Sequence, residues 1–255
     1  MWITRFADVP VKIVYSNNIH ISPEQRLPCL MNDDSTSAIS GYAEIVHYLS
    51  QQGYNVGELG AETIALIANL DRATTLTYWT LFCNKENYET ITRPQISQAI
   101  AFPMQYNVAM KLQKDAAERC ASEGIKHSKK PPKEKGLNKT HTDALAADRN
   151  RKAMVSMSQE TMQILTLGEK VYQLCSRMLG QEPDPARFLL MANIYLQTLP
   201  GLPQRPLETV ISKYDALKTE IPSLEFTNIV EPGPSEYNLS NWLASWTPWT
   251  PWTLG

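Results

Sequence analysis

The hydrophobic periodicity of the chain changes at Gly41, and this change most restricts what the chain can fold into. Before it, residues 11–17 (VKIVYSN) alternate and are rich in β-branched side chains, which is typical of a strand. Residues 27–33 and 38–40 are two more short extended segments, separated by turn residues. After it, apolar side chains recur every three or four residues, as on one face of a helix: Tyr42, Ile45, Val46 and Leu49. We therefore expect a small sheet that leads into a helix.

Helical periodicity continues through most of the remaining chain. A good N-cap, Asp184, is followed by proline at the first helical position. Pro103 is expected to kink or split the second of these helices. The pattern predicts helices at about 61–84, 95–122, 151–179, 184–199 and 207–218. The fold class is thus an α/β unit over 1–54 followed by an all-helical unit over 60–220.

Composition excludes several classes of protein. The formal charge of −2 over 255 residues gives no global field for binding nucleic acid. The four cysteines lie far apart without ligand-type neighbours, so we expect neither a disulfide framework nor a zinc site. No window is apolar enough to span a bilayer. We expect no phosphate-binding loop, no catalytic serine motif, no metal and no cofactor, and we place His47 on the exposed side of its helix.

Two segments stand apart from this pattern. Residues 125–150 are rich in lysine and carry two prolines, which favours a solvated, mobile insertion; a patch for anionic lipid or an acidic partner is the alternative. Residues 221–255 form a tail rich in proline and tryptophan. Three of its tryptophans are spaced by three residues, the repeat of a polyproline II helix, so their indoles are expected to share one edge. These residues are Trp246, Trp249 and Trp252, with Trp242 ahead of them.

Such a tryptophan ridge needs a place to dock, because exposed aromatic surface is costly in water. A groove on its own domain, a partner protein and a membrane interface are all open, as is a disordered end.

Several motifs together resemble a known fold. The segments LPCL at 27–30, ISGYAEIVHYL at 39–49 and DPARFLLMANIYL at 184–196 resemble the glutathione-transferase fold, a thioredoxin-like sheet domain followed by an all-helical domain. That resemblance implies a cis bond before Pro28. Within this superfamily, residues 78–103 (YWTLFCNKENYETITRPQISQAIAFP) are similar to the metaxins and to the fungal metaxin-like subunit of the mitochondrial sorting and assembly machinery. The likeness covers about 11–112 and 167–218.

The chain departs from active transferases in two ways. The fold normally opens with a strand and a helix that carry the thiol-activating residue, but only ten residues precede the strand at 11–17. This first unit is therefore expected to be missing, shortened or replaced, with MWITRFADVP as only the end of its helix. Gly41 and Tyr42 stand where active enzymes have a Gln-Ser pair that binds the tripeptide. Glycine has no donor, and tyrosine is expected to fill the space. The resemblance therefore implies a scaffold without catalytic residues.

By this resemblance, the chain is expected on the cytosolic face of the mitochondrial outer membrane. Its partners there would be a membrane β-barrel subunit, a second metaxin-like subunit and β-barrel precursors, with peripheral membrane contact and no nucleic acid. As partner-binding residues we predict Trp242, Trp246, Trp249, Trp252 and Arg93; for Arg93, a structural cap or ion pair is equally open.

Two alternatives remain. One is a glutathione-dependent transferase or reductase using Cys29, beside Pro28, although no neighbouring basic residue would lower its pKa. The other is a glutathione-transferase-like scaffold of a translation complex, which is not expected to carry the pattern at 78–103.

Overall fold

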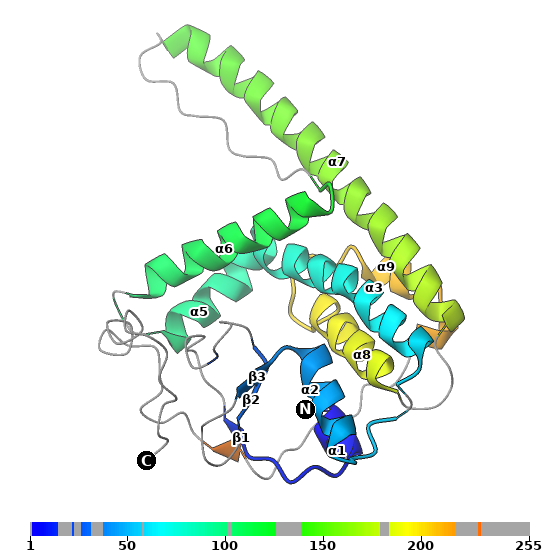
Figure 1. Cartoon of the computed structure of the whole chain (residues 1–255). Helices are drawn as coiled ribbons and strands as arrows, with labels where there is room; N and C mark the ends of the chain where they lie inside the picture. Colours follow the sequence, from blue (N-terminus) through cyan, green and yellow to red (C-terminus); the bar gives the residue numbers. More distant parts are fainter. Residues whose placement is uncertain are drawn as a thin grey trace.

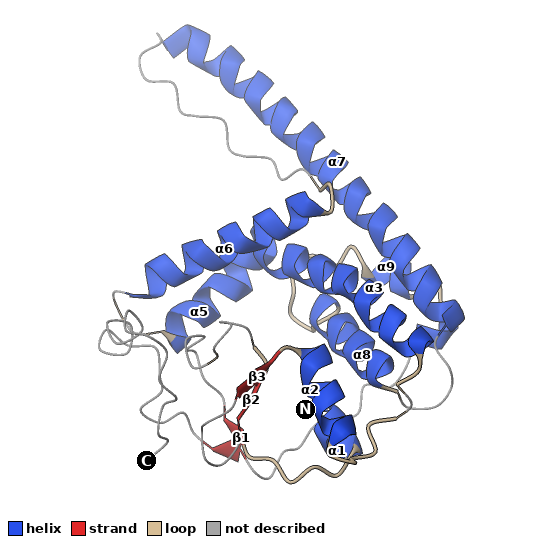
Figure 2. Cartoon of the chain, in the orientation of Figure 1, coloured by secondary structure: helices blue, strands red, loops and turns tan. Residues whose placement is uncertain are grey.

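A computed structural model describes residues 2–14, 22, 27–31, 38–57, 59–100, 102, 104–125, 139–178, 184–217 and 229–230. Short strands and two helices form one side of the molecule, and a group of longer helices forms the rest (Figures 1 and 2). The first part holds α1 (Trp2–Phe6), β1 (Ile13–Val14), β2 (Cys29–Met31), β3 (Ala38–Ser40) and α2 (Tyr42–Gln51). The expected mixed α/β layout with a helical remainder is thus confirmed.

The second part is helical. It consists of α3 (Ala61–Tyr78), a π-helical segment (Trp79–Cys83), α4 (Lys85–Asn87), a second π-helical segment (Tyr88–Thr92), α5 (Arg93–Ala99), α6 (Met104–Ser122), α7 (Lys139–Met178), α8 (Pro185–Gln197), α9 (Glu208–Ile211) and a 3₁₀ turn (Asp215–Leu217). One more strand, β4 (Ile229–Val230), follows.

The strands pair in two separate ladders. β2 and β3 are antiparallel, with Cys29 opposite Ser40. The peptide bond between Leu27 and Pro28, just ahead of β2, is cis, as the resemblance implied. β1 pairs in parallel with β4, so Ile13 lies opposite Ile229. β4 belongs to residues 221–255, the segment that the sequence analysis describes as a tail, and backbone pairing in the folded chain brings these two residues to β1.

The apolar face predicted for α2 is confirmed and closes the core of the first part. Ile45, Val46 and Leu49 are buried, and Tyr42 packs against the same cluster. Ile3 and Ala7 of the N-terminal segment complete this cluster, together with Val56. A residue of α8, Phe188, also packs against it, and its ring lies 5.3 Å from that of Phe6. The two parts of the chain therefore share an apolar contact.

α3 is the central helix of the second part and packs against α6, α7 and α8 (Figure 1). Its core-facing residues Leu70 and Leu76 are completely buried, as are Tyr172 of α7 and Leu207 ahead of α9. Gly168 lets α7 approach closely, because a Cβ atom there would lie 2.8 Å from a methyl carbon of Leu207. Deleting buried methyl groups from such a core costs about 2–5 kcal/mol for each leucine changed to alanine.

Two helices differ from the sequence expectation. α7 begins at Lys139, whereas the pattern predicted a start near Arg151, so the lysine-rich segment at 125–150 is helical over its second half. Several alanines at 144–153 favour a helix even though the segment is polar. The helix expected at 207–218 is only one turn long, α9, followed by a 3₁₀ turn. There the backbone N–H groups of Lys213 and Tyr214 donate to the carbonyl oxygens three residues back, at 3.2 and 3.1 Å, so the four-residue spacing of the α-helix ends.

The other helix predictions agree with the structure. α3 and the π-helical segment after it cover the helix expected at 61–84, and the helix expected at 95–122 is split into α5 and α6 around Pro103. Asp184 caps α8 as predicted, since its carboxylate accepts a 2.7 Å hydrogen bond from the backbone N–H of Arg187.

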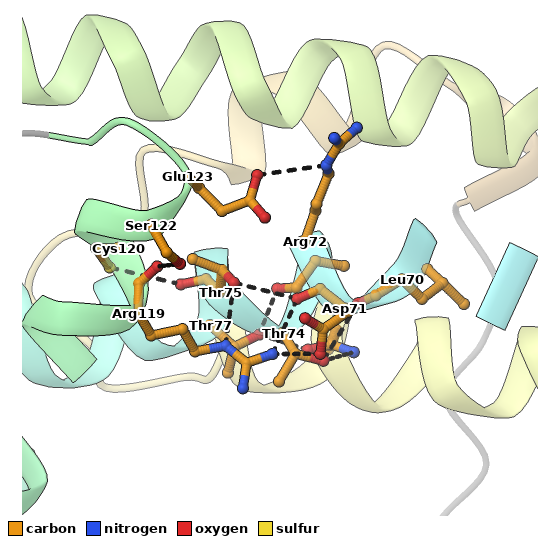
Figure 3. Close-up of polar contacts among 12 residues, drawn as sticks. Leu70, Asp71, Arg72, Thr74, Thr75, Thr77, Arg119, Cys120, Ser122 and Glu123 are labelled. Carbon is orange, nitrogen blue, oxygen red and sulfur yellow. Dashed lines mark hydrogen bonds and ion pairs between the residues drawn. The ribbon is translucent and has the colours of Figure 1, made fainter. Parts of the chain in front are cut away.

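A polar network holds α6 and α8 to α3. The Arg119 guanidinium of α6 pairs with the Asp71 carboxylate and donates to the Thr75 hydroxyl at 3.1 Å (Figure 3). It also lies 5.1 Å from the centre of the Tyr78 ring. A second ion pair joins Arg72 to Glu123 at 3.3 Å. From α8, Asn193 and Gln197 bond the Thr77 hydroxyl at 2.7 and 2.9 Å. The buried members of this network, Thr77, Asn193 and Gln197, fix α8 against α3 because each has a partner, whereas the ion pairs of α6 lie nearer the surface.

Candidate functional site

The position where the resemblance places a thiol ligand lies at the end of β3, against the helical part. The backbone N–H of Gly41 donates to the carbonyl oxygen of Pro28 at 2.9 Å. This bond continues the β2–β3 ladder by one residue. The cis-proline segment, Gly41 and Tyr42 therefore lie together.

Tyr42 joins the two parts of the chain. Its hydroxyl donates a 2.6 Å hydrogen bond to the carbonyl oxygen of Pro185, the first residue of α8. Burial, with the neighbouring Asp184 carboxylate as the smaller cause, raises the pKa of the Tyr42 hydroxyl far above its ordinary value. The tyrosine is therefore a neutral donor engaged with backbone, and its side chain occupies the space as predicted.

Gly41 cannot readily be given a ligand-binding side chain. Its φ of 95° lies in the left-handed region, which glycine adopts at little cost. A Cβ atom added there would lie 2.5 Å from a carboxylate oxygen of Glu44. The exposed Glu44 side chain can move aside, so it is the backbone conformation at residue 41 that disfavours a larger residue.

Cys29, the residue of the enzymatic alternative, is half-buried. Its closest polar contact is the Ser40 hydroxyl directly across the ladder, 4.0 Å from the sulfur. Ser40 in turn shares a 2.5 Å hydrogen bond with Ser22. Within the described ranges, no lysine, arginine or histidine forms a hydrogen bond or ion pair with Cys29. His47 is exposed, as predicted, and its ring pairs with Gln51 at 2.8 Å. The described contacts therefore provide no cation to activate the thiol.

The metaxin-like motif at 78–103 contains a buried polar clamp that the sequence analysis did not identify. The Asn87 side chain donates to the carbonyl oxygens of Thr80 at 3.0 Å and Gln204 at 2.8 Å, and accepts from the Gln204 N–H at 2.9 Å. Asn84 caps α4 by accepting from the Asn87 N–H at 3.2 Å. Asn87 is completely buried. The spacing of Asn84 and Asn87 signals a cap, but no local pattern indicates Gln204, 117 residues away.

Two more residues of that motif have internal roles. The Thr92 hydroxyl donates to the carbonyl oxygen of Leu81 at 2.7 Å. The Tyr88 hydroxyl donates to the carbonyl oxygen of Ala109 in α6 at 3.2 Å. Burial raises the pKa of Tyr88, and the positive charge of Arg93 partly opposes this shift. These contacts are structural, so the motif serves the fold at both positions.

Arg93 lies on the surface at the first position of α5. Its guanidinium forms no ion pair or hydrogen bond with another residue of the described part. No contact there supports the alternative that Arg93 is a structural cap or ion-pair partner. Trp242, Trp246, Trp249 and Trp252 lie outside the described residues. Of the predicted partner-binding residues only Arg93 lies in the described part of the chain, and the role of all five stays a prediction.

Among the described side chains, no group of three or more potential metal ligands gathers. None of the described helices combines the length and apolar character needed to cross a bilayer.

Comparison with known proteins identifies the family. Residues 1–113 match the family Tom37, described as outer mitochondrial membrane transport complex protein, and residues 114–228 match the Tom37 C-terminal domain. The chain is 28% identical to mouse Metaxin-1 over 122 residues, which cover 46% of this chain and 38% of that protein. It is 29% identical to Metaxin-3 of Xenopus laevis over 124 residues, 45% of this chain and 38% of that protein.

The aligned residues thus span well under half the length of these curated relatives. The two family matches together cover nearly the whole chain, from residue 1 to residue 228. The chain belongs to the Tom37 family of outer mitochondrial membrane transport complex proteins, which includes the metaxin-like proteins.

Proposed function

We propose that the chain is a non-catalytic scaffold subunit of the machinery that inserts β-barrel precursors into the mitochondrial outer membrane. It acts on the cytosolic face, where it contacts a membrane β-barrel subunit and a second metaxin-like subunit. The family match supports a location at the outer mitochondrial membrane and a role in transport. The specific partners proposed here rest on the resemblance of residues 78–103 to the metaxins.

One observation carries the non-catalytic part of the proposal, namely the hydrogen bond from Tyr42 to the Pro185 carbonyl oxygen. In an active glutathione-dependent enzyme, this place holds the carboxylate of the ligand. Here a neutral phenol is bonded to the backbone of α8, and Gly41 beside it offers no side chain. Binding a tripeptide would require breaking this contact and desolvating an anion without a donor to receive it.

We further propose that the fold is a modified glutathione-transferase fold in which β4 replaces the opening strand. In a β-α-β unit the two strands are parallel, so the strand ahead of β1 would be its parallel neighbour. β4 is parallel to β1 and pairs with both of its residues. The strand therefore comes from the far end of the chain, and the segment after α9 returns to the first part.

Affinity purification from mitochondria in mild detergent tests the scaffold role. The chain should capture a membrane β-barrel protein and a second metaxin-like protein. Arg93→Gln should reduce this capture, while the fold stays intact, because Arg93 is exposed and lies outside the described polar contacts. Arg151→Gln is a matched control, since Arg151 is also exposed and lies on the distant helix α7. Recovery of only soluble synthetases or elongation factors would instead support the translation scaffold.

Titration calorimetry with millimolar glutathione tests the non-catalytic role independently. We expect no heat of binding above that of dilution. Saturable binding would overturn this part of the proposal. Protease treatment of intact mitochondria addresses the side of the membrane: the chain should be digested without rupture of the outer membrane.

A further inference from the structure

Two of the buried cysteines meet in the core of the helical part. The sulfur of Cys83, the last residue of the π-helical segment after α3, lies 3.9 Å from the sulfur of Cys120 in α6, and the two thiols share a hydrogen bond. Both residues are buried. They are 37 positions apart, so no local pattern indicates this contact. Among the described residues, neither Cys29 nor Cys175 forms a hydrogen bond with another thiol.

The two elements that carry this thiol pair are packed against each other. α6 contacts the π-helical segment, and the sulfur of Cys120 also lies 4.0 Å from the carbonyl oxygen of Thr75 (Figure 3). A disulfide bond is about 2.0 Å long, so the two sulfurs need to approach each other by about 2 Å. Rotation of the two short side chains about χ1 moves the sulfurs over such a distance. The thiol pair is therefore close enough to be joined without unfolding of either element.

One thiol of the pair ionises more readily than the other. The hydrogen bond from Cys83 lowers the pKa of Cys120. The positive charge of Arg119 acts in the same direction, whereas burial and the Glu160 carboxylate oppose the shift. The same hydrogen bond, together with burial, raises the pKa of Cys83. Cys120 also lies two residues before the end of α6 at Ser122, and helix ends fray. Its thiolate is thus the more available nucleophile of the two.

We infer that Cys83 and Cys120 form a reversible disulfide when the chain meets hydrogen peroxide, and that this bond is a redox-sensitive lock between α6 and the segment after α3. The Cys120 thiolate attacks one peroxide oxygen, so that an S–O bond forms and the O–O bond breaks. The released hydroxide takes up the thiol proton and becomes water. The Cys83 thiolate then attacks the sulfenic sulfur, which forms the S–S bond and releases hydroxide that takes up the second thiol proton. Two thiols are oxidised, and one peroxide is reduced to two waters.

The lock closes a loop that contains most of the metaxin-like segment. α4, the second π-helical segment, α5 and most of α6 lie between the two cysteines. A disulfide restricts the unfolded chain, so it should shift the folding equilibrium toward the folded state by about 30- to 1,000-fold. In a reducing compartment the bond is transient, as is typical of disulfides that sense oxidants. The lock concerns the packing of this chain alone and does not depend on the proposed function.

Peptide mapping of the purified full chain tests the lock. Trypsin releases Cys83 in residues 73–85 and Cys120 in residues 120–126, so a disulfide joins two peptides of different mass. The native chain is treated with hydrogen peroxide, and the remaining thiols are then alkylated in denaturant. The joined peptides should contain most of Cys83 and Cys120, and dithiothreitol should restore both thiols. The oxidised chain should also unfold at a higher urea concentration than the reduced chain.

Three variants isolate the thiol pair. Cys29→Ser removes the half-buried thiol, which is able to link two chains, and it should leave the joined peptides unchanged. Cys120→Ala should abolish the joined peptides and the rise in the urea midpoint after peroxide treatment. Cys175→Ala is its matched control, because it also removes a buried thiol, and it should abolish neither effect. Each variant is compared with itself before and after peroxide treatment, so a change in its basal stability does not obscure the result.

Three results would overturn the inference. The first is a native chain in which Cys83 and Cys120 remain thiols at a peroxide concentration that oxidises Cys29. The second is pairing of Cys83 and Cys120 with Cys29 or Cys175 as often as with each other. The third is a urea midpoint that falls on oxidation, which would mean that the bond strains the core. If instead the disulfide behaves as expected but no β-barrel protein is captured from mitochondria, the proposed function fails and the lock stands.

Discussion

The hydroxyl of Tyr42 donates a 2.6 Å hydrogen bond to the carbonyl oxygen of Pro185, 143 residues further along the chain. This bond links the start of α2 to the start of α8, beside the contact between Phe6 and Phe188. The Tyr42 side chain thus fastens the two parts of the chain together. A scaffold benefits from such a contact because partners then meet a surface of defined shape.

Changing Tyr42 to phenylalanine should destabilise the chain. The variant keeps the ring in the core of the first part but leaves the Pro185 carbonyl oxygen without its donor. The free energy of unfolding should fall by about 1–2 kcal/mol, as measured by urea denaturation. Tyr195→Phe is the matched control, because Tyr195 is 42% exposed, and it should change stability by less than about 0.5 kcal/mol. Equal effects of the two changes would contradict the structural role of Tyr42.

Stability should decline in alkaline solution, in part through Tyr42. Burial raises the pKa of Tyr42 in the folded chain, whereas in the unfolded chain it is near its ordinary value of about 10. Its contribution is therefore complete below about pH 10 and is lost as the pH rises beyond it, since the unfolded state then releases the proton first. Urea midpoints should fall above about pH 10, and less steeply for Tyr42→Phe. The urea midpoint of Tyr42→Phe should still fall with pH to some extent, because burial also raises the pKa of Tyr172. Parallel curves for the two proteins would rule out the contribution of Tyr42.

The four cysteines should differ sharply in reactivity. Cys29 is half-buried, whereas Cys83, Cys120 and Cys175 are buried. Burial raises the pKa of Cys175 to about 12, which keeps its thiol protonated at neutral pH. Iodoacetamide should modify Cys29 first in the native chain, and the other three only after unfolding, as followed by peptide mass spectrometry. Prompt labelling of Cys175 would show that the packing of α7 is looser than described.

Asn87 should be among the most sensitive polar positions. Asn87→Ala removes hydrogen bonds to Thr80 and Gln204 and leaves buried backbone groups without partners. The expected loss is about 2–4 kcal/mol in the free energy of unfolding, measured by urea denaturation. Asn107→Ala, at an exposed position of α6, should have almost no effect or stabilise the helix slightly. A loss below about 1 kcal/mol for Asn87→Ala would mean that water satisfies the released groups.

Much of the helical organisation could be predicted because its causes are local. The spacing of Ile45, Val46 and Leu49 determines which face of α2 is buried, and Asp184 with Pro185 determines where α8 begins. The start of α7 was missed, since lysine and proline in the preceding residues suggested a solvated segment although the alanines after them favour a helix. The apolar periodicity at 207–218 gives no sign of the change after α9 to backbone bonds of three-residue spacing.

The candidate site likewise has some features that the sequence predicts and others that it does not. The glycine and tyrosine at 41 and 42 are visible in the sequence, and so is the lack of a ligand-binding pair there. Three contacts are visible only in the folded chain. They are the hydrogen bond from Tyr42 to Pro185, the hydrogen bonds between Asn87 and Gln204, and the pairing of β4 with β1. Helix periods and caps act over a few residues, so the sequence determines them directly. Contacts between residues more than a hundred positions apart depend on how whole elements pack, and only the tertiary structure decides them.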